Sequence, residues 1–246
     1  MKVAILGATR GMGRSLSRLM IERGDRVMLL GRDAADLERS AADLSARGGA
    51  GARVFHAHCD LAKPETFGPA LDRAERQLEG LDCVVVTAGL FATQEELEAD
   101  ASLAQRVLTV DFANTVVFCE EARKRLLERG GGTLCVFSSV AGDRGRKPVV
   151  LYGAAKAGLS AYLEGLDHRF RAKGLKTVCV KPGFVRTGMT EGLKAPPFAG
   201  EPDAVAQVVL DGIDRGTPVV YAPPIWKWVM TAVKALPRFA MRRAGF

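Results

Sequence analysis

The stretch KVAILGATRGMG, residues 2–13, contains the pattern that decides the fold. It begins with an apolar run typical of a buried strand, and a helical pattern starts at its end. Between the two lie Gly7, Gly11 and Gly13, and glycine lets a backbone turn tightly and approach a pyrophosphate at the amino end of a helix. The spacing G-x-x-x-G-x-G differs from the commoner G-x-G-x-x-G. The stretch predicts a strand, a nucleotide-binding turn and a helix; a plain tight turn is the alternative.

Short apolar strands continue to alternate with longer helical patterns as far as residue 221. We expect strands at residues 2–6, 26–30, 53–58, 83–87, 133–137, 177–181 and 218–221, and helices at 12–22, 33–46, 64–78, 102–128, 151–171 and 202–214. Continuously apolar strands are typical of a parallel sheet buried on both faces. The expected fold class is α/β: a single doubly wound Rossmann domain over residues 1–222, with a parallel seven-stranded sheet and helices on both faces. Residues 223–246 remain as a basic amphipathic tail.

The net charge of +7 belongs mainly to that tail. Residues 215–246 contain six basic side chains and no acidic one, which leaves +1 for residues 1–214. The body is nearly neutral and the tail has no nucleic-acid reading motif, so we expect no nucleic-acid partner. The five cysteines are scattered without a C-x-x-C pair, which favours reduced core residues of a cytoplasmic protein. His56, His58 and His168 lack cysteine or acidic partners at ligand spacing, so we expect no metal site.

The segment SSVAGDRGRKPVVLYGAAK, residues 138–156, contains the groups suited to chemistry. Ser139 follows an expected strand at the sheet edge where α/β folds bind ligands, and Tyr152 and Lys156 lie four residues apart on one helix face. A hydroxyl, a phenol and an ammonium group together suit proton transfer to or from an oxygen atom. The lysine cation favours the phenolate, so we expect it to lower the pKa of Tyr152 toward neutrality. A buried tyrosine beside a surface lysine is the alternative.

The end of the second expected strand indicates the nucleotide. An acidic residue there would bind the ribose 2′-hydroxyl of NAD, whereas arginine accommodates the 2′-phosphate of NADP. The chain has Gly31 and then Arg32 at this point, and Arg10 in the glycine-rich turn offers a second guanidinium. We expect Asp33 to cap the next helix. The pattern favours NADPH; two solvated surface arginines are the alternative.

Six motifs in order resemble the short-chain dehydrogenase/reductase family from residue 2 to about residue 221. They are Gly7-x-x-x-Gly11-x-Gly13, Cys59-Asp60-Leu61, Thr87-Ala88-Gly89, Ser139, Tyr152-x-x-x-Lys156 and Pro182-Gly183-Phe184-Val185-Arg186-Thr187. The resemblance implies that Ser139 orients a substrate carbonyl, Tyr152 is the acid in reduction, and Lys156 binds the nicotinamide ribose and tunes Tyr152. It implies an NADP(H) site formed by Gly7, Thr9, Arg10, Gly11, Met12, Gly13, Arg32, Asp60, Leu61, Ala88, Gly89, Tyr152, Lys156, Pro182, Gly183, Val185 and Thr187.

The chain departs from the family pattern at two positions. Thr87 stands where the family has an asparagine, and we expect it to keep the structural role. Asp111 stands where the family has the asparagine of a proton relay to the lysine. An ionised carboxylate accepts hydrogen bonds but cannot donate them, and its charge raises the pKa of a nearby lysine or tyrosine. Asp111 is thus a fourth candidate catalytic residue, Asn114 could replace the missing amide, and a purely structural Asp111 is the alternative.

The second half has a narrower likeness. Residues 138–146, 181–187, 236–238 and 241–243 resemble the reductases that act on decaprenyl-phosphate-linked 2-keto-pentofuranose. This likeness implies a lipid-linked sugar as substrate, beside the general expectation of a small carbonyl compound. Residues 189–202 are expected to form a mobile flap over that substrate.

The tail predicts a helix at residues 225–236, with Lys227, Thr231 and Lys234 on one face and apolar side chains over much of the rest. Such a helix suits an anionic membrane surface, which residues 225–246 would contact. Packing on a neighbouring subunit of a homodimer or homotetramer is the alternative. The expected location is the cytoplasm, either free or peripherally on the inner face of the membrane.

These observations support two hypotheses on function. The leading one is an NADPH-dependent oxidoreductase that reduces a ketone to a secondary alcohol, or catalyses the reverse reaction, by hydride transfer with Tyr152 as the proton donor. The other, motivated by Asp111, is an NADPH-binding sensor or scaffold with weak or no catalysis.

Overall fold

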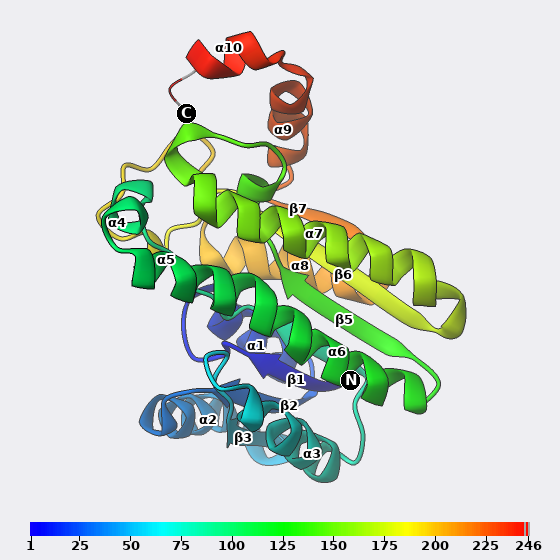
Figure 1. The fold of residues 1–246 in the computed structure, drawn as a ribbon. Helices are drawn as coiled ribbons and strands as arrows, with labels where there is room; N and C mark the ends of the chain where they lie inside the picture. The colour runs from blue at the N-terminus through cyan, green and yellow to red at the C-terminus, as the bar shows by residue number, and fades with distance from the viewer. Residues whose placement is uncertain (244, 246) are drawn as a thin grey trace.

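The structure, a computed structural model, describes residues 1–243 and 245. Its centre is a parallel sheet of seven strands in the order β3-β2-β1-β4-β5-β6-β7 (Figure 1). The strands are β1 (Lys2–Leu6), β2 (Arg26–Gly31), β3 (Val54–His58), β4 (Cys83–Val86), β5 (Gly132–Phe137), β6 (Leu175–Pro182) and β7 (Val219–Ala222). The order reverses between β1 and β4, where Leu6 pairs with Leu30 on one side and with Val86 on the other. The expected fold class is confirmed.

Helices cover both faces of the sheet. They are α1 (Gly11–Glu22), α2 (Ala34–Gly48), α3 (Phe67–Leu78), α4 (Gln94–Ala99), α5 (Ala101–Leu108), α6 (Thr115–Glu128), α7 (Val150–Phe170), α8 (Pro202–Arg215), α9 (Trp226–Ala235) and α10 (Arg238–Arg243). Alternate strand residues serve the two layers: Val3 and Ile5 pack with α1, α2 and α8, whereas Ala4 and Leu6 pack with α3, α6 and α7. Nearly all residues of β1, β2, β4 and β5 are buried, which explains the continuously apolar sequences of these strands.

The prediction of one continuous helix at residues 102–128 is wrong, because the helix is interrupted near its middle. Between α5 and α6 the chain forms a π-helical segment, Thr109–Asn114, and the Thr115 hydroxyl donates to the Val110 carbonyl oxygen at 2.7 Å. The widened turn places Asp111 fully inside the protein, with no exposed surface. Apolar periodicity does not reveal such a turn, because α5 and α6 each keep the helical pattern. π-Helical turns occur frequently at functional sites.

The tail forms two helices, α9 and α10, rather than the one expected. Met230 and Val233 of α9 are buried in a small cluster with Val140, so α9 packs on the body beside the segment that follows β5. Residues 244 and 246 of the expected tail lie outside the described residues.

Candidate active site

Ser138 and Ser139 follow β5; Ser138 is bonded to α7, and Ser139 is bonded within the loop that precedes α7. The Ser138 hydroxyl donates to the Lys156 carbonyl oxygen at 2.9 Å, and the Ser139 hydroxyl accepts the Ala141 amide at 3.1 Å. The loop then approaches α7 very closely: a Cβ built on Gly142 would lie 2.6 Å from the Lys156 carbonyl carbon. Only glycine permits this approach. The sequence therefore fixes Ser139 relative to the helix that carries Tyr152 and Lys156.

Lys156 lies at the centre of the site and is buried. Its Nζ atom donates to the Phe137 carbonyl oxygen at 3.3 Å and lies 3.5 Å from Oδ2 of Asp111. It also lies 5.6 Å from the ring centroid of Tyr152, within cation–π range. The structure thus brings Tyr152, Lys156 and Asp111 together at the carboxyl end of β5.

Asp111 links this ion pair to the chain after β4. Its Oδ1 atom accepts the Leu90 amide at 2.6 Å, and Gly89 packs against both partners of the pair. A Cβ built on Gly89 would lie 3.2 Å from Oδ1 of Asp111 and 3.5 Å from Nζ of Lys156. Asp111 therefore has a structural contact with the Gly89–Leu90 backbone and an electrostatic contact with Lys156.

The expected lowering of the pKa of Tyr152 is not found. Burial raises the pKa of the phenol, Lys156 opposes this, Asp111 raises the pKa further, and the nearby Ser139 hydroxyl lowers it; the result is a raised value. The expectation counted the lysine but neither burial nor the buried carboxylate. Tyr152 therefore holds its proton at neutral pH.

The pKa values of Asp111 and Lys156 are both shifted in the buried pair that they form. Burial, the largest single influence, would lower the pKa of Lys156, but the charge and hydrogen bond of Asp111 together with Tyr152 and Cys179 raise it overall. Burial raises the pKa of Asp111, while Lys156 and the Leu90 amide favour its ionised form. We describe the pair as ammonium and carboxylate, because each buried charge compensates the other.

The glycine-rich turn is closely packed at the carboxyl end of β1. Gly7 has a φ of 94°, and a Cβ built on it would lie 2.5 Å from the Ala88 nitrogen. A Cβ on Gly13 would lie 2.2 Å from the Gly7 carbonyl oxygen. The Thr87 hydroxyl, in place of the family's asparagine, lies 2.9 Å from that oxygen and donates to it. Thr87 thus stabilises the turn, as expected.

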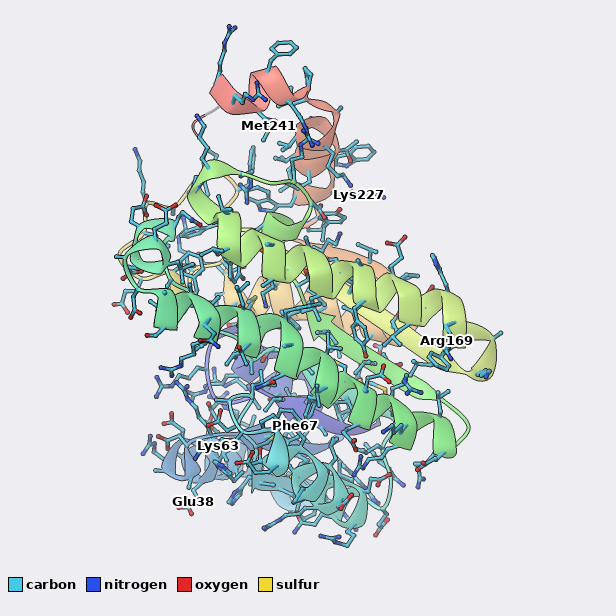
Figure 2. The ribbon with its side chains drawn as sticks, viewed as in Figure 1. Glu38, Lys63, Phe67, Arg169, Lys227 and Met241 are labelled. Carbon is cyan, nitrogen blue, oxygen red and sulfur yellow. The ribbon has the colours of Figure 1, made fainter. Side chains whose placement is uncertain are left out.

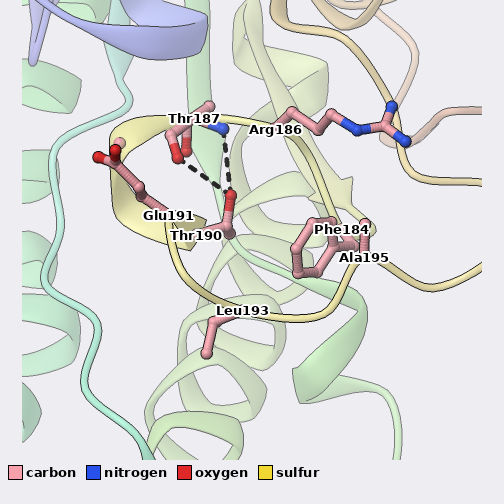
Figure 3. Close-up of a pocket in the computed structure, with 8 residues that line it drawn as sticks. Phe184, Arg186, Thr187, Thr190, Glu191, Leu193 and Ala195 are labelled. Carbon is pink, nitrogen blue, oxygen red and sulfur yellow. Dashed lines mark hydrogen bonds between the residues drawn. The ribbon is translucent and has the colours of Figure 1, made fainter.

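The chain after β6 closes over the same edge of the sheet. Gly11 faces Thr187, whose Cγ2 would lie 3.3 Å from a Cβ at residue 11. The Thr190 hydroxyl donates to the Thr187 carbonyl oxygen at 3.1 Å and accepts the Thr187 amide at 3.1 Å (Figure 3). A hollow of about 450 Å³ lies within this loop; its lining includes Thr187, Phe184 and Leu193 but none of Ser139, Tyr152 and Lys156. It adjoins the nicotinamide end of the expected cofactor site and does not contain the candidate catalytic groups.

The arginines expected to select the nucleotide differ in their surroundings. Asp33 caps α2 by accepting the Asp36 amide at 2.8 Å, as expected. Arg10 donates to Asp36 through Nη2 at 2.6 Å. Arg32 is exposed at the end of β2, and no ion pair or side-chain hydrogen bond involves it among residues 1–243 and 245. Arg32 is therefore the guanidinium available to an anion.

The remaining expected cofactor residues line one edge. Gly7, Thr9, Gly11, Met12, Ala88, Gly89 and Gly183 are half-exposed there, whereas Leu61, Pro182 and Val185 have little exposed surface. Asp60 accepts the Ala62 amide at 2.9 Å, and the Leu61 carbonyl oxygen accepts from Nδ2 of Asn114 at 2.7 Å. Asn114 thus donates one amide hydrogen to Leu61, and the suggestion that it replaces the relay asparagine stays a prediction.

A comparison with protein families agrees with this arrangement at the sheet edge. The sequence model of the family described as short chain dehydrogenase matches residues 1–197. The chain belongs to the short chain dehydrogenase family. It is accordingly an oxidoreductase of CH–OH and C=O groups that uses a nicotinamide dinucleotide.

Named members of the short chain dehydrogenase family resemble this chain over most of its length. An uncharacterized oxidoreductase of Mycobacterium tuberculosis is 32% identical over 243 residues, which cover 98% of this chain and 96% of that protein. Carbonyl reductase family member 4 of Xenopus tropicalis is 27% identical and covers 84% of this chain and 88% of its own length. A short-chain type dehydrogenase/reductase from Mycobacterium ulcerans has a TM-score of 0.81 at 20% identity, covering 89% and 86% of the two chains. None of these three names a lipid-linked sugar, so the narrower likeness gains no support from them.

Two residues of this short chain dehydrogenase site were not predicted from the sequence. The ring of Phe91 meets that of Tyr152 edge-on, with centroids 5.2 Å apart. Trp226 of α9 lies against Gly183, so closely that a Cβ on Gly183 would lie 2.0 Å from its Nε1 atom. Phe91 lies two residues after the Thr87-Ala88-Gly89 motif, and this proximity was a usable signal. Nothing in the sequence pattern places Trp226.

In the part of the chain that the structure describes, no helix has both the length and the apolarity needed to span a membrane. Within the same residues, no group of three or more histidine, cysteine or acidic side chains could hold a metal ion. The five cysteines are all buried and free.

Proposed function

We propose that the protein is an NADPH-dependent carbonyl reductase, which reduces a ketone to a secondary alcohol or catalyses the reverse reaction. The observation that carries the proposal is the meeting of Ser139, Tyr152 and Lys156 at the carboxyl end of β5, beside the glycine-rich turn. A ketone, or the matching secondary alcohol, is the substrate class that these groups suit.

The residues of the glycine-rich turn fit a dinucleotide. A Cβ at residue 7 or 13 would collide with Ala88, Thr87 or the Gly7 carbonyl oxygen, so glycine is needed for the tight turn that begins α1, where a pyrophosphate would bind. Ala88, Gly89 and Thr187 border the same edge and would contact the nucleotide and its nicotinamide end. When bound, the cofactor supplies the hydride chemistry, and the protein supplies position and a proton.

Arg32 supports the choice of NADPH over NADH. It follows β2 directly, where Gly31 leaves no acidic group for a ribose 2′-hydroxyl and Asp33 is occupied as a helix cap. An exposed guanidinium without an acidic partner suits a 2′-phosphate.

Each candidate catalytic residue then has a defined role. Tyr152 donates its proton to the carbonyl oxygen, for which its raised pKa keeps the phenol protonated at neutral pH. Ser139 orients that oxygen from the end of β5. Lys156 places a permanent positive charge beside the phenol, and Asp111 acts through Lys156 as a positioning residue.

Replacing Tyr152 with phenylalanine tests the proposal. Tyr152→Phe should bind NADPH as the wild type does, measured by quenching of protein fluorescence, and should lose about 10²- to 10⁴-fold in turnover of a ketone panel. Tyr162→Phe is the matched control: Tyr162 lies on the same helix and donates to Glu120 at 2.8 Å, outside the site. Wild-type turnover by Tyr152→Phe would remove Tyr152 as the acid. NADPH binding without turnover of any ketone by the wild type would favour the sensor or scaffold.

A further inference from the structure

The two faces of α9 have different surroundings. Its inner face is attached to the body: Met230 is buried, Nε1 of Trp226 donates to the Phe198 carbonyl oxygen at 3.3 Å, and Nη2 of Arg144 donates to the Leu236 carbonyl oxygen at 2.9 Å. These contacts fix the orientation of α9. They also determine which side chains of the tail face solvent.

The outer side chains are aromatic and basic. Trp228 is 69% exposed, Phe239 64% and Ile225 40%. Phe198, 59% exposed, belongs to the loop that Trp226 ties to α9. We call the exposed basic and large apolar side chains of residues 225–243 the tail surface; they comprise Ile225, Lys227, Trp228, Lys234, Arg238, Phe239, Arg242 and Arg243.

The charge of the tail surface has one sign. Its five cations have no ion pair within residues 1–243 and 245, and residues 215–246 contain no acidic side chain. Nζ of Lys227 lies 5.8 Å from the ring centroid of Trp228, so cation and aromatic ring are adjacent. Exposed aromatics of this size on a soluble surface mark an interaction site, and the charge defines its partner as anionic.

We propose that the tail surface docks on an anionic lipid bilayer. Trp and Phe side chains enter the headgroup region from one face of a basic helix, while Lys and Arg contact the lipid phosphates. A second copy of this chain suits the surface less well, because a two-fold contact would bring its five cations against the same five. The docked surface adjoins the candidate site through Trp226, Gly183 and Phe198.

Vesicle flotation tests the docking. The full-length protein should float with vesicles of equal parts phosphatidylcholine and phosphatidylglycerol, float poorly with phosphatidylcholine alone, and detach as salt is raised. The triple variant K227Q/K234Q/R238Q should lose on the order of a hundredfold in partition coefficient, from about 1 kcal/mol for each cation near the surface. The matched control is K63Q/R73Q/R76Q, which removes three exposed cations around α3 at the other end of the molecule; Lys63 and Lys227 lie at opposite ends in Figure 2.

Tryptophan fluorescence tests which side chains enter the lipid, because Trp226 and Trp228 are the only two tryptophans in the chain. Brominated lipids should quench Trp228 in W226F, and they should quench W228F far less. If W226F does not fold, the loss of quenching between the wild type and W228F gives the same answer.

Several results would overturn the proposal. They are equal flotation of the two triple variants, bound protein with unquenched Trp228, concentration-dependent self-association that covers Trp228 without lipid, or tighter binding to duplex DNA than to vesicles. None of these measurements uses enzyme activity, so they stand apart from the test of Tyr152.

Discussion

Asp111 brings a buried negative charge into the candidate site. Its carboxylate lies fully buried 3.5 Å from the Lys156 ammonium, and it raises the pKa of both Lys156 and Tyr152. A phenol that holds its proton favours Tyr152 as an acid over Tyr152 as a base. On the proposed function, the carboxylate would therefore keep Tyr152 in the protonated form that reduction needs at neutral pH.

Replacing Asp111 with asparagine should move the pH dependence. Without the negative charge the pKa of Tyr152 falls, so alcohol oxidation, which needs the phenolate, should rise at lower pH than in the wild type. Ketone reduction, which needs the phenol, should begin to decline at lower pH. Full pH–rate profiles of Asp111→Asn measure both, and Asp100→Asn, which only alters the cap of α5, is the control. Superimposable profiles would show that Asp111 has no influence on Tyr152.

A second prediction at the residue scale concerns the selection of NADPH by Arg32. Arg32→Ala should weaken NADPH binding about tenfold or more and leave NADH binding unchanged, because a hydrogen bond to a charged group contributes about 1.5–3 kcal/mol. Fluorescence titration with both nucleotides measures the ratio. Arg39→Ala is the control, since Arg39 is exposed on α2 but already bonded to Asp36. An equal loss for NADPH and NADH would place Arg32 away from the 2′-phosphate.

Single residues also show what the sequence could predict. Gly7, Asp33 and Thr87 have the structural roles their positions indicated, because a turn, a cap and a short hydroxyl contact depend on local spacing. The pKa of Tyr152 was mispredicted because it depends on burial and on a residue 41 positions away along the chain.

At the scale of elements, strands and helices were predictable where the apolar period is undisturbed. The π-helical segment Thr109–Asn114 and the short helix α4 were not, because neither changes the period of its neighbours. The ion pairs between helices could not be predicted from the sequence either. Asp43 of α2 accepts from Arg14 and Arg18 of α1 at 3.2 and 3.3 Å, and from Arg47 of its own helix at 3.1 Å.

This α1–α2 contact should make stability depend on acid. Burial alone would raise the pKa of Asp43, but Arg14, Arg47 and Arg18 lower it from 3.8 to about 2. A lowered pKa contributes stability that is present above about pH 4 and is lost as the pH falls toward about 2. Asp43→Asn should cost about 1 kcal/mol or less at pH 7, since the cluster is near the surface, and the difference from wild type should shrink as the pH approaches 3.

Urea unfolding across this pH range measures the effect. Glu38→Gln is the control, because Glu38 is exposed on the same helix without an ion pair in the described part of the chain. A deficit of Asp43→Asn that is as large near pH 3 as at pH 7 would mean that its cause is not the carboxylate charge.

At the scale of the whole molecule, the tail is part of the architecture that surrounds the site. Val140, one residue after Ser139, is buried by Met230 and Val233, and Trp226 covers Gly183 of the chain after β6. The same helix presents Trp228 to solvent. An amphipathic sequence predicts two faces, but the contacts with Val140 and Gly183 come from the fold and determine which face remains free.

Met230→Ala tests whether α9 supports the catalytic loop. Truncating a fully buried methionine costs about 2–5 kcal/mol, and because α9 is near the end of the packed chain, we expect this cost to appear as local opening rather than global unfolding. Amide hydrogen exchange should accelerate at least tenfold in residues 226–235 and also in residues 138–142, with a parallel loss of turnover. Thr231→Ala, on the exposed face of the same helix, should change neither segment. Faster exchange confined to α9 would show that Ser139 keeps its position without the tail.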